Sequence, residues 1–252
     1  MTQTEPSYGF MTINKETNNI INEIYQWKDN VLYTASMMKI VFLGLFLEYG
    51  YDDLHTRVAI NNNHKEVWGI LDSLVYEDET SYNTLLLLMI VISDNTATNI
   101  IYEYLIRKIW DISQTILQKF GFTNTKAFDL TDPITFDYGS GQSTPYEFIR
   151  IMKYFFYDSV HADYIREILS KQYVKGRWLR YLDRKDFIST WNKTGQIDTV
   201  INDCGFLETQ ESYILYVVFY PIDHVPEFLY DVENDIYKKI WHIVKEYVSK
   251  TI

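Results

Sequence analysis

A serine and a lysine three residues apart are the first pair in this sequence that could do chemistry. They are Ser36 and Lys39, at the start of an apolar run that continues to Leu47. Residues three apart lie on one face of a helix, so the two side chains can approach each other. Burial lowers the pKa of an amine, which lets a neutral lysine take the serine's proton and make it a nucleophile. The same spacing also arises by chance in a chain of this size, so the pair alone supports only a hypothesis.

Two further polar motifs follow along the chain. Ser93-Asp94-Asn95 lies between an apolar run at 85–92 and a second helical run at 97–106, and Lys193-Thr194-Gly195 accompanies a strand-like segment. Each has an ordinary interpretation, as the cap of a helix in the first case and as a strand end with a turn glycine in the second. Their order is informative, because serine-x-x-lysine, serine-aspartate-asparagine and lysine-threonine-glycine are the three motifs of class A β-lactamases and penicillin-binding proteins.

With these motifs the sequence resembles the class A β-lactamase family of serine hydrolases. Residues 121–125 and Ser143-Thr144-Pro145 look like the two edges of the family's omega loop, and residues 202–206 are similar to the strand after its third motif. The resemblance covers nearly the whole chain, from about Tyr8 to the C-terminus. It implies an enzyme that forms an acyl-enzyme on a β-lactam or on a related amide or ester.

The resemblance also implies roles for four catalytic residues. Ser36 would be the acyl-accepting nucleophile, and Lys39 would accept its proton directly or through water. Ser93 would pass the proton to the leaving nitrogen. Lys193 would keep the cleft positive and bind a substrate carboxylate.

Four neighbouring residues would bind the substrate. Asn95 would contact a substrate amide and hold Lys39, and the Thr194 hydroxyl would assist at the carboxylate. Gly195 and Gln196 follow in the same strand, and the backbone amides of Gln196 and Ser36 would form the oxyanion hole. Each such donor can contribute roughly 3 kcal/mol to the barrier.

The sequence departs from the family's pattern in the omega loop. β-Lactamases of this class carry a glutamate there that activates the water which frees the acyl-enzyme. The corresponding segment, 125–142, contains no glutamate, and only Asp129, Asp132 or Asp137 could replace it. We therefore expect deacylation to be slow.

Alternative functions follow from this departure. The chain could be a D-alanyl peptidase or esterase, for which β-lactams would act as slow inhibitors. It could also be a non-hydrolytic β-lactam-binding or sensor protein that stays acylated, or a degenerate fold without covalent chemistry.

Composition limits the partners and the compartment. The formal net charge of −11 argues against nucleic acid and anionic membranes as partners. The resemblance implies a small-molecule substrate, namely a β-lactam, a peptide or an ester. Residues 1–6 lack the features of a secretory signal, and no uncharged run is long enough for a membrane span. Cys204 is the only cysteine, which fits a reducing compartment. We expect a cytoplasmic protein, unless a signal has been removed.

No motif indicates a cofactor or a metal. The five histidines are scattered without the spacing of metal ligands, and no glycine-rich phosphate loop is present. Trp68, ahead of the second motif, could flank the entrance of a cleft or pack in the core. The oligomeric state cannot be read from the sequence.

Hydrophobic patterns predict the elements that must position these residues. Residues 8–14 and 20–27 alternate as a hairpin, and residues 187–191, 200–207 and 212–220 read as three more strands. The stretch between them is helical, with a helix at 112–120 ending at Gly121 and another starting at Pro145. Residues 226–250 form a terminal amphipathic helix.

We therefore predict an α/β (α+β) fold of the β-lactamase/DD-peptidase type. Both chain ends form an antiparallel sheet backed by the last helix, and this sheet packs against an all-helical domain. The sheet domain would comprise residues 1–30 and 186–252, and the helical domain 31–185 would carry the first two motifs. The family's usual helix ahead of the hairpin is not evident, so its sheet face would be covered otherwise or left partly open.

Overall fold

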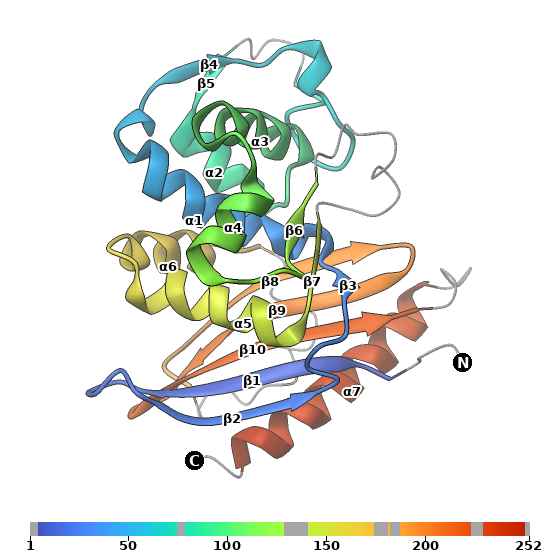
Figure 1. The fold of residues 1–252 in the computed structure, drawn as a ribbon. Coiled ribbons are helices and arrows are strands. Elements are labelled where there is room, and N and C mark those ends of the chain that lie inside the picture. The colour runs from blue at the N-terminus through green and yellow to red at the C-terminus, as the bar shows by residue number, and fades with distance from the viewer. Residues whose placement is uncertain are drawn as a thin grey trace.

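A computed structural model describes residues 5–74, 79–128, 141–173, 181, 187–222 and 229–249. A five-stranded antiparallel sheet lies between a group of helices on one face and a single long helix on the other (Figure 1). The first described strand and the last described helix both lie on the side of the molecule that holds the sheet. The predicted fold class is confirmed.

The sheet has the strand order β2-β1-β10-β9-β8, which joins the N-terminal hairpin to the three C-terminal strands. In β10, residues 214, 216, 218 and 220 pack in the core beneath the last helix, whereas residues 215, 217 and 219 pack in the core beneath the other helices. This alternation follows from the two-residue period of a strand. The strands are β1 (Ser7–Asn14), β2 (Ile20–Gln26), β8 (Ser189–Ile197), β9 (Val200–Glu208) and β10 (Ser212–Pro221).

In the described residues, six α-helices form most of the other part of the molecule. They are α1 (Lys39–Gly50), α2 (Tyr82–Val91), α3 (Asn95–Ile109), α4 (Ile112–Phe120), α5 (Pro145–Lys153) and α6 (Ala162–Ser170). Helix α1 is buried on nearly all sides, as its uninterrupted apolar run indicates. The long helix on the opposite face of the sheet is α7 (Leu229–Ser249).

Two predicted helix boundaries are confirmed. Helix α4 ends where Gly121 takes a left-handed conformation with φ 74°, and the Gly121 amide donates to Leu117 O. Helix α5 starts at Pro145, and its N-cap is Thr144, whose hydroxyl accepts from the Glu147 amide. The terminal helix predicted at 226–250 is present from Leu229 to Ser249, and residues 226–228 and 250 lie outside the described residues.

Short strands also occur inside the region predicted to be all helical. They are β3 (Leu32–Tyr33), β4 (Arg57–Ala59), β5 (Glu79–Ser81), β6 (Lys126–Ala127) and β7 (Gly141–Ser143). Strand β7 pairs with both β3 and β6, and β4 pairs with β5. Segments of two or three residues are too short to show a hydrophobic period, so the sequence could not reveal them.

The outer face of the sheet is covered mainly by α7. Tyr247 of this helix stacks on Phe10 of β1, and its hydroxyl lies 2.8 Å from that of Thr12. At the sheet edge, Ile20 and Ile24 of β2 are 37% and 39% exposed. The face is thus largely covered, with the edge strand left partly open.

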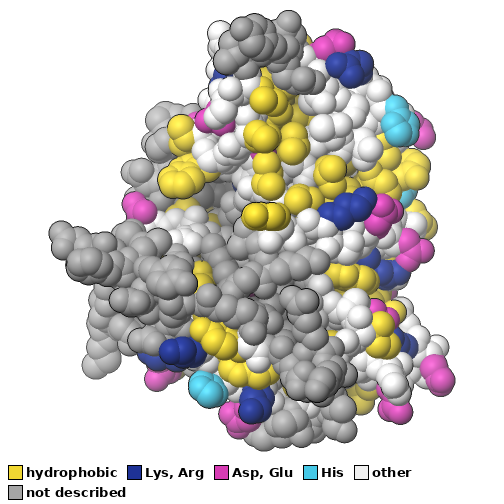
Figure 2. All heavy atoms as spheres, turned by 180° about the vertical axis from the view of Figure 1, so that it is seen from behind, with side chains coloured by type: hydrophobic (Ala, Val, Ile, Leu, Met, Phe, Trp, Pro, Cys, Tyr) yellow, Lys and Arg dark blue, Asp and Glu magenta, His cyan; other side chains and the backbone are white. Residues whose placement is uncertain are grey.

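Where the described residues form the face shown in Figure 2, basic side chains lie among acidic and apolar ones and form no large patch. No helix in the described part of the chain is long and apolar enough to cross a membrane. The division into two domains, the compartment and the absence of nucleic-acid partners stay predictions.

Candidate active site

Ser36 lies in a 3-10 turn, η1 (Ala35–Met38), which runs directly into α1. The residue before it, Ala35, has φ 47°, a conformation that L-residues other than glycine rarely adopt. Such a residue costs of order 1–3 kcal/mol and persists only where its surroundings hold it. One restraint is the Thr34 amide, which donates to Gly141 O at 2.8 Å and so ties this segment to β7.

A second restraint on the turn is strand β8. A Cβ atom at Gly195 would lie 2.6 Å from Thr34 O and 3.1 Å from the Met37 amide nitrogen. Only glycine therefore allows β8 to approach η1 this closely. The contact brings the third motif against the turn that carries Ser36.

Lys39 is completely buried, and its amine has three partners on other segments. Nζ lies 2.7 Å from Ser93 O, 3.0 Å from Ser93 Oγ and 2.7 Å from Asn95 Oδ1. Burial, and after it the charge of Lys193, hold the pKa of Lys39 well below its ordinary value, while Asp94 acts in the opposite direction. The first two effects shift the equilibrium from the ammonium toward the neutral amine.

Ser93 joins the two lysines. Its backbone has φ 62°, and its hydroxyl oxygen lies 3.0 Å from Lys39 Nζ and 3.1 Å from Lys193 Nζ. Lys193 is also completely buried and donates to Thr194 O at 2.9 Å. The three motifs therefore meet at one hydroxyl group.

Asp94 organises the segment ahead of the second motif as well as capping α3. One carboxylate oxygen accepts from the Ala97 amide at 2.8 Å, and the other accepts from the Ile70 and Leu71 amides at 2.6 and 3.0 Å. A Cβ atom at Gly69 would lie 2.3 Å from that second oxygen. The capping interpretation of the motif is thus correct for Asp94, and it coexists with the contacts of Ser93.

Asn95 fixes both its own amide group and a neighbouring turn. Its Nδ2 donates to Val67 O at 2.9 Å, which directs Oδ1 toward Lys39, and its backbone amide donates to Trp68 O at 3.2 Å. Trp68 has φ 68° and is 82% exposed, so the alternative that it packs in the core is wrong. Val67 and Ile70 on the same turn are 55% and 46% exposed.

The structure thus brings together four of the eight predicted site residues. Lys39, Ser93, Asn95 and Lys193 form one hydrogen-bonded cluster. Within the described residues no hydrogen bond joins Ser36 to Lys39. The roles assigned to these residues stay predictions.

Other predicted residues lie beside this cluster or outside the described chain. Thr194 is buried in β8, and Gln196 follows Gly195 in the same strand. Asp129, Asp132 and Asp137 lie outside the described residues. No three His, Cys, Asp or Glu side chains in the described ranges are grouped so that they could hold a metal ion.

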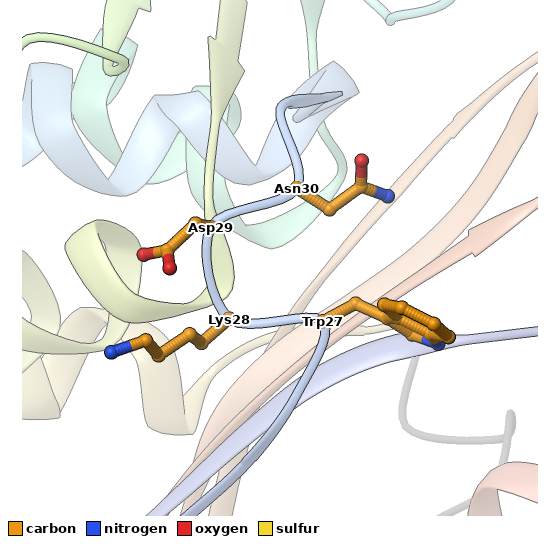
Figure 3. A pocket seen from close by; sticks show the side chains of 4 residues that line it. All are labelled: Trp27, Lys28, Asp29 and Asn30. Carbon is orange, nitrogen blue, oxygen red and sulfur yellow. The ribbon is translucent and has the colours of Figure 1, made fainter.

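A hollow of about 470 Å³ lies elsewhere, at the connection between β2 and β3. Its described lining residues are Trp27, Lys28, Asp29 and Asn30, whose side chains point to both sides of the connection (Figure 3). None of the three motifs contributes to this lining, so the hollow is separate from the candidate active site.

Comparisons with known proteins agree with the geometry. A family model described as the beta-lactamase enzyme family matches residues 2–240. No curated protein matches the chain in sequence.

Three solved structures illustrate the likeness in fold. PBP-A superposes with a TM-score of 0.76 and 19% identity over 97% of this chain and 92% of that chain. A class A beta-lactamase from Mycobacterium abscessus gives 0.76 and 15% identity over 97% and 95% of the two chains. An ancestral class A beta-lactamase gives 0.78 and 15% identity over the same shares.

Proposed function

The chain belongs to the beta-lactamase enzyme family and has its serine hydrolase fold, and from this premise we propose that Ser36 is acylated by a β-lactam or a related amide or ester. One observation carries the proposal. A buried lysine three residues after Ser36 shares a hydroxyl group with a second buried lysine from a distant strand. Two buried amines around one serine cost free energy unless one of them is neutral, and a neutral amine can act as a base.

The partners of Lys39 fit a neutral amine, which has two N–H groups and one lone pair. Ser93 O and Asn95 Oδ1 can only accept, so they take the two N–H groups. The Ser93 hydroxyl then donates its proton to the lone pair and accepts from Lys193. Every group in this arrangement has a partner.

Acylation would change this arrangement in a defined way. As Ser36 Oγ bonds to the carbonyl carbon, the Ser93 hydroxyl turns away from the lone pair of Lys39. The Ser36 proton passes to that lone pair, directly or through water, and the amine becomes an ammonium. The ammonium donates to all three acceptors, including Ser93 Oγ, so the Ser93 proton is free to protonate the leaving nitrogen as the carbon–nitrogen bond breaks. Lys39 then returns a proton to Ser93 and is neutral again.

Exposed side chains on the turn before the second motif favour a substrate that carries an apolar group. Val67, Trp68 and Ile70 are exposed beside Asn95, the residue proposed to bind the substrate amide. A large apolar side group next to that amide would cover these side chains. We expect substrates with such a group to acylate the protein faster.

A stable acyl-enzyme is the second candidate outcome. Residues 125–142 contain no glutamate, so hydrolysis of the acyl-enzyme would be slow unless an aspartate of that segment replaces it. The structure of a point mutant of PBP-A, which superposes with a TM-score of 0.76 at 17% identity, is of an acyl-enzyme complex with penicillin G. A D-alanyl peptidase, an esterase or a β-lactam-binding sensor would fit this alternative.

Intact-mass measurements over time test the proposal. We expect wild-type protein incubated with penicillin G to gain the mass of the opened penicillin on Ser36, and Ser36→Ala to gain nothing. Ser73→Ala, which removes an exposed serine hydroxyl, should behave as wild type. An adduct that disappears with turnover of a chromogenic cephalosporin indicates a β-lactamase, and a persistent adduct indicates the second candidate. Equal adducts on wild type and Ser36→Ala, or none on either, would contradict the proposal.

A further inference from the structure

A buried carboxylate that pairs with no cation in the described part of the chain lies next to the strands that support the Ser36 turn. Glu147 is in the first turn of α5 and is 6% exposed. Among the described residues it makes no ion pair. Both of its oxygens accept from the Asn124 amide at 3.2 Å, Oε1 also accepts from Asn124 Nδ2 at 3.0 Å, and Oε2 accepts from Thr125 Oγ1 at 2.7 Å.

The charge of Glu147 sets the direction of a chain of hydroxyl groups. A carboxylate only accepts, so the Thr125 hydroxyl must donate its proton to Glu147. Thr125 Oγ1 lies 2.7 Å from Ser143 Oγ, and Ser143 must therefore donate to Thr125. Thr125 and Ser143 are 1% and 0% exposed, so water does not compete for these bonds.

This network connects two segments that are far apart in sequence. Thr125 directly precedes β6, and Ser143 is the last residue of β7. The two strands pair through Lys126 and Gln142 and through Ala127 and Gly141. Glu147 therefore clamps β6, β7 and the start of α5 together.

The clamp continues to the nucleophile through β7. Gly141 O accepts from the Thr34 amide, two residues before Ser36, and β3 pairs with β7 immediately before that bond. A Cβ atom at Gly141 would lie 2.3 Å from Lys126 O and 2.7 Å from Met38 Cε. A shift of β7 would therefore move the η1 turn, whose Ala35 already has φ 47°.

We propose that Glu147 is a positioning residue of the proposed hydrolase, which holds β7 against η1 and thereby sets the position of the Ser36 hydroxyl. This inference rests on the proposed function, although Glu147 touches none of the residues assigned to catalysis. Among the described residues only neutral groups donate to this buried carboxylate, an arrangement that costs free energy, and what the carboxylate provides in return is a single arrangement of β6, β7 and α5.

Substitutions at Glu147 and Thr144 separate positioning from stability. Glu147→Ala leaves the Asn124 amide and Thr125 without their acceptor. Thr144→Ala removes only the hydroxyl that caps α5 and leaves the carboxylate contacts in place. Both variants lower the thermal stability, so rates are compared well below their melting temperatures.

Glu147→Gln provides the conservative rescue. Its amide oxygen can face Asn124 while its NH2 group donates to Thr125. The Thr125 hydroxyl then donates to Ser143, and Ser143 donates to Thr144 O, which lies 3.3 Å from its oxygen. The chain of hydroxyl groups reverses but stays connected.

Two readouts test the proposal. With penicillin G we expect Glu147→Ala to acylate roughly tenfold to a hundredfold more slowly than wild type, as for a reacting group displaced by about 1 Å. We expect Thr144→Ala and Glu147→Gln to stay close to wild type. Hydrogen exchange of the Thr34 amide should be faster in Glu147→Ala than in Thr144→Ala. If Glu147→Ala matches Thr144→Ala in both measurements, the proposal is wrong. If wild type is not acylated, the proposed function fails, and the exchange of Thr34 still decides whether the clamp exists.

Discussion

Replacing Lys39 by methionine provides the most direct test of the neutral amine in the cluster. Lys39 is completely buried, and its pKa is held well below its ordinary value of 10.5. Methionine keeps a long, apolar side chain but can neither bind a proton nor donate a hydrogen bond. Lys39→Met should therefore lose the base and the three contacts while the packing of α1 is largely kept.

The stability of wild type relative to Lys39→Met should depend on pH. Between the folded-state pKa and 10.5, the unfolded chain binds a proton at Lys39 that the folded chain does not bind. Stability therefore rises with pH in this window, by about 1.4 kcal/mol per pH unit at most, and is lost again as the pH falls toward the folded-state pKa. Above the window, Lys39→Met should be less stable, because Ser93 O and Asn95 Oδ1 lose donors that are worth roughly 1–3 kcal/mol each.

The acylation rate should depend on the protonation state of the same amine. Loss of a general base lowers a rate by about 10²–10⁴-fold, which corresponds to roughly 3–5 kcal/mol in the barrier. We expect the acylation rate of wild type to rise with pH through the folded-state pKa of Lys39, and that of Lys39→Met to be low and to lack this rise.

Urea unfolding and penicillin acylation from pH 6 to 10 provide the measurements. Lys65→Met, at an exposed lysine, is the matched control and should show the same pH dependence as wild type. A difference in unfolding free energy between wild type and Lys39→Met that does not change with pH would refute the neutral amine.

Three further substitutions test the surroundings of the cluster. Ser93→Ala removes the hydroxyl that lies 3.0 and 3.1 Å from the two amines, and acylation by penicillin G should fall about 10²-fold or more; an unchanged rate would exclude Ser93 from proton transfer. Gly195→Ala places a Cβ atom 2.6 Å from Thr34 O, and it should cost about 1–3 kcal/mol in urea unfolding and slow acylation; full stability would show that β8 does not need this approach. Trp68→Ala, at an 82% exposed residue, should change the free energy of unfolding by less than about 0.5 kcal/mol. It should slow acylation more for β-lactams with a large aromatic side chain than for those with a small one. Equal slowing would contradict a contact between Trp68 and the apolar group of the substrate.

The sequence predicted most of the fold because the hydrophobic patterns are long and regular. The run from Ile40 to Leu47 indicated a helix buried on all sides, and α1 has that environment. Gly121 and Pro145 marked helix ends through backbone conformations that other residues rarely adopt. These features depend on neighbours in sequence, which is why they can be read without a structure.

Contacts across the site could not be derived from local patterns. Ser93 and Lys193 are 100 residues apart, and only the resemblance to a family indicated that they meet. The sequence left open whether Trp68 flanks a cleft or packs in the core. Its exposure depends on hydrogen bonds that join Asn95 and Asp94 to the turn around Trp68, and the sequence does not show these bonds. Glu147 follows Thr144 at the spacing of a capping box, but its carboxylate contacts Asn124 and Thr125 instead of closing that box.

The two halves of the proposed reaction depend on different parts of the chain. Every group proposed for acylation belongs to η1, α1, the turn before α3, the first residue of α3, or β8, and α1, that turn and β8 meet at the Ser93 hydroxyl. Deacylation needs a base within reach of a water molecule, and the only acidic residues that the sequence offers in the corresponding segment are aspartates. Substitution of Asp129, Asp132 and Asp137 by asparagine, one at a time, should therefore leave the acylation rate unchanged. If one of them slows loss of the adduct, that residue is the base and the protein is a β-lactamase; if none does, the acyl-enzyme is the end point of the reaction with β-lactams.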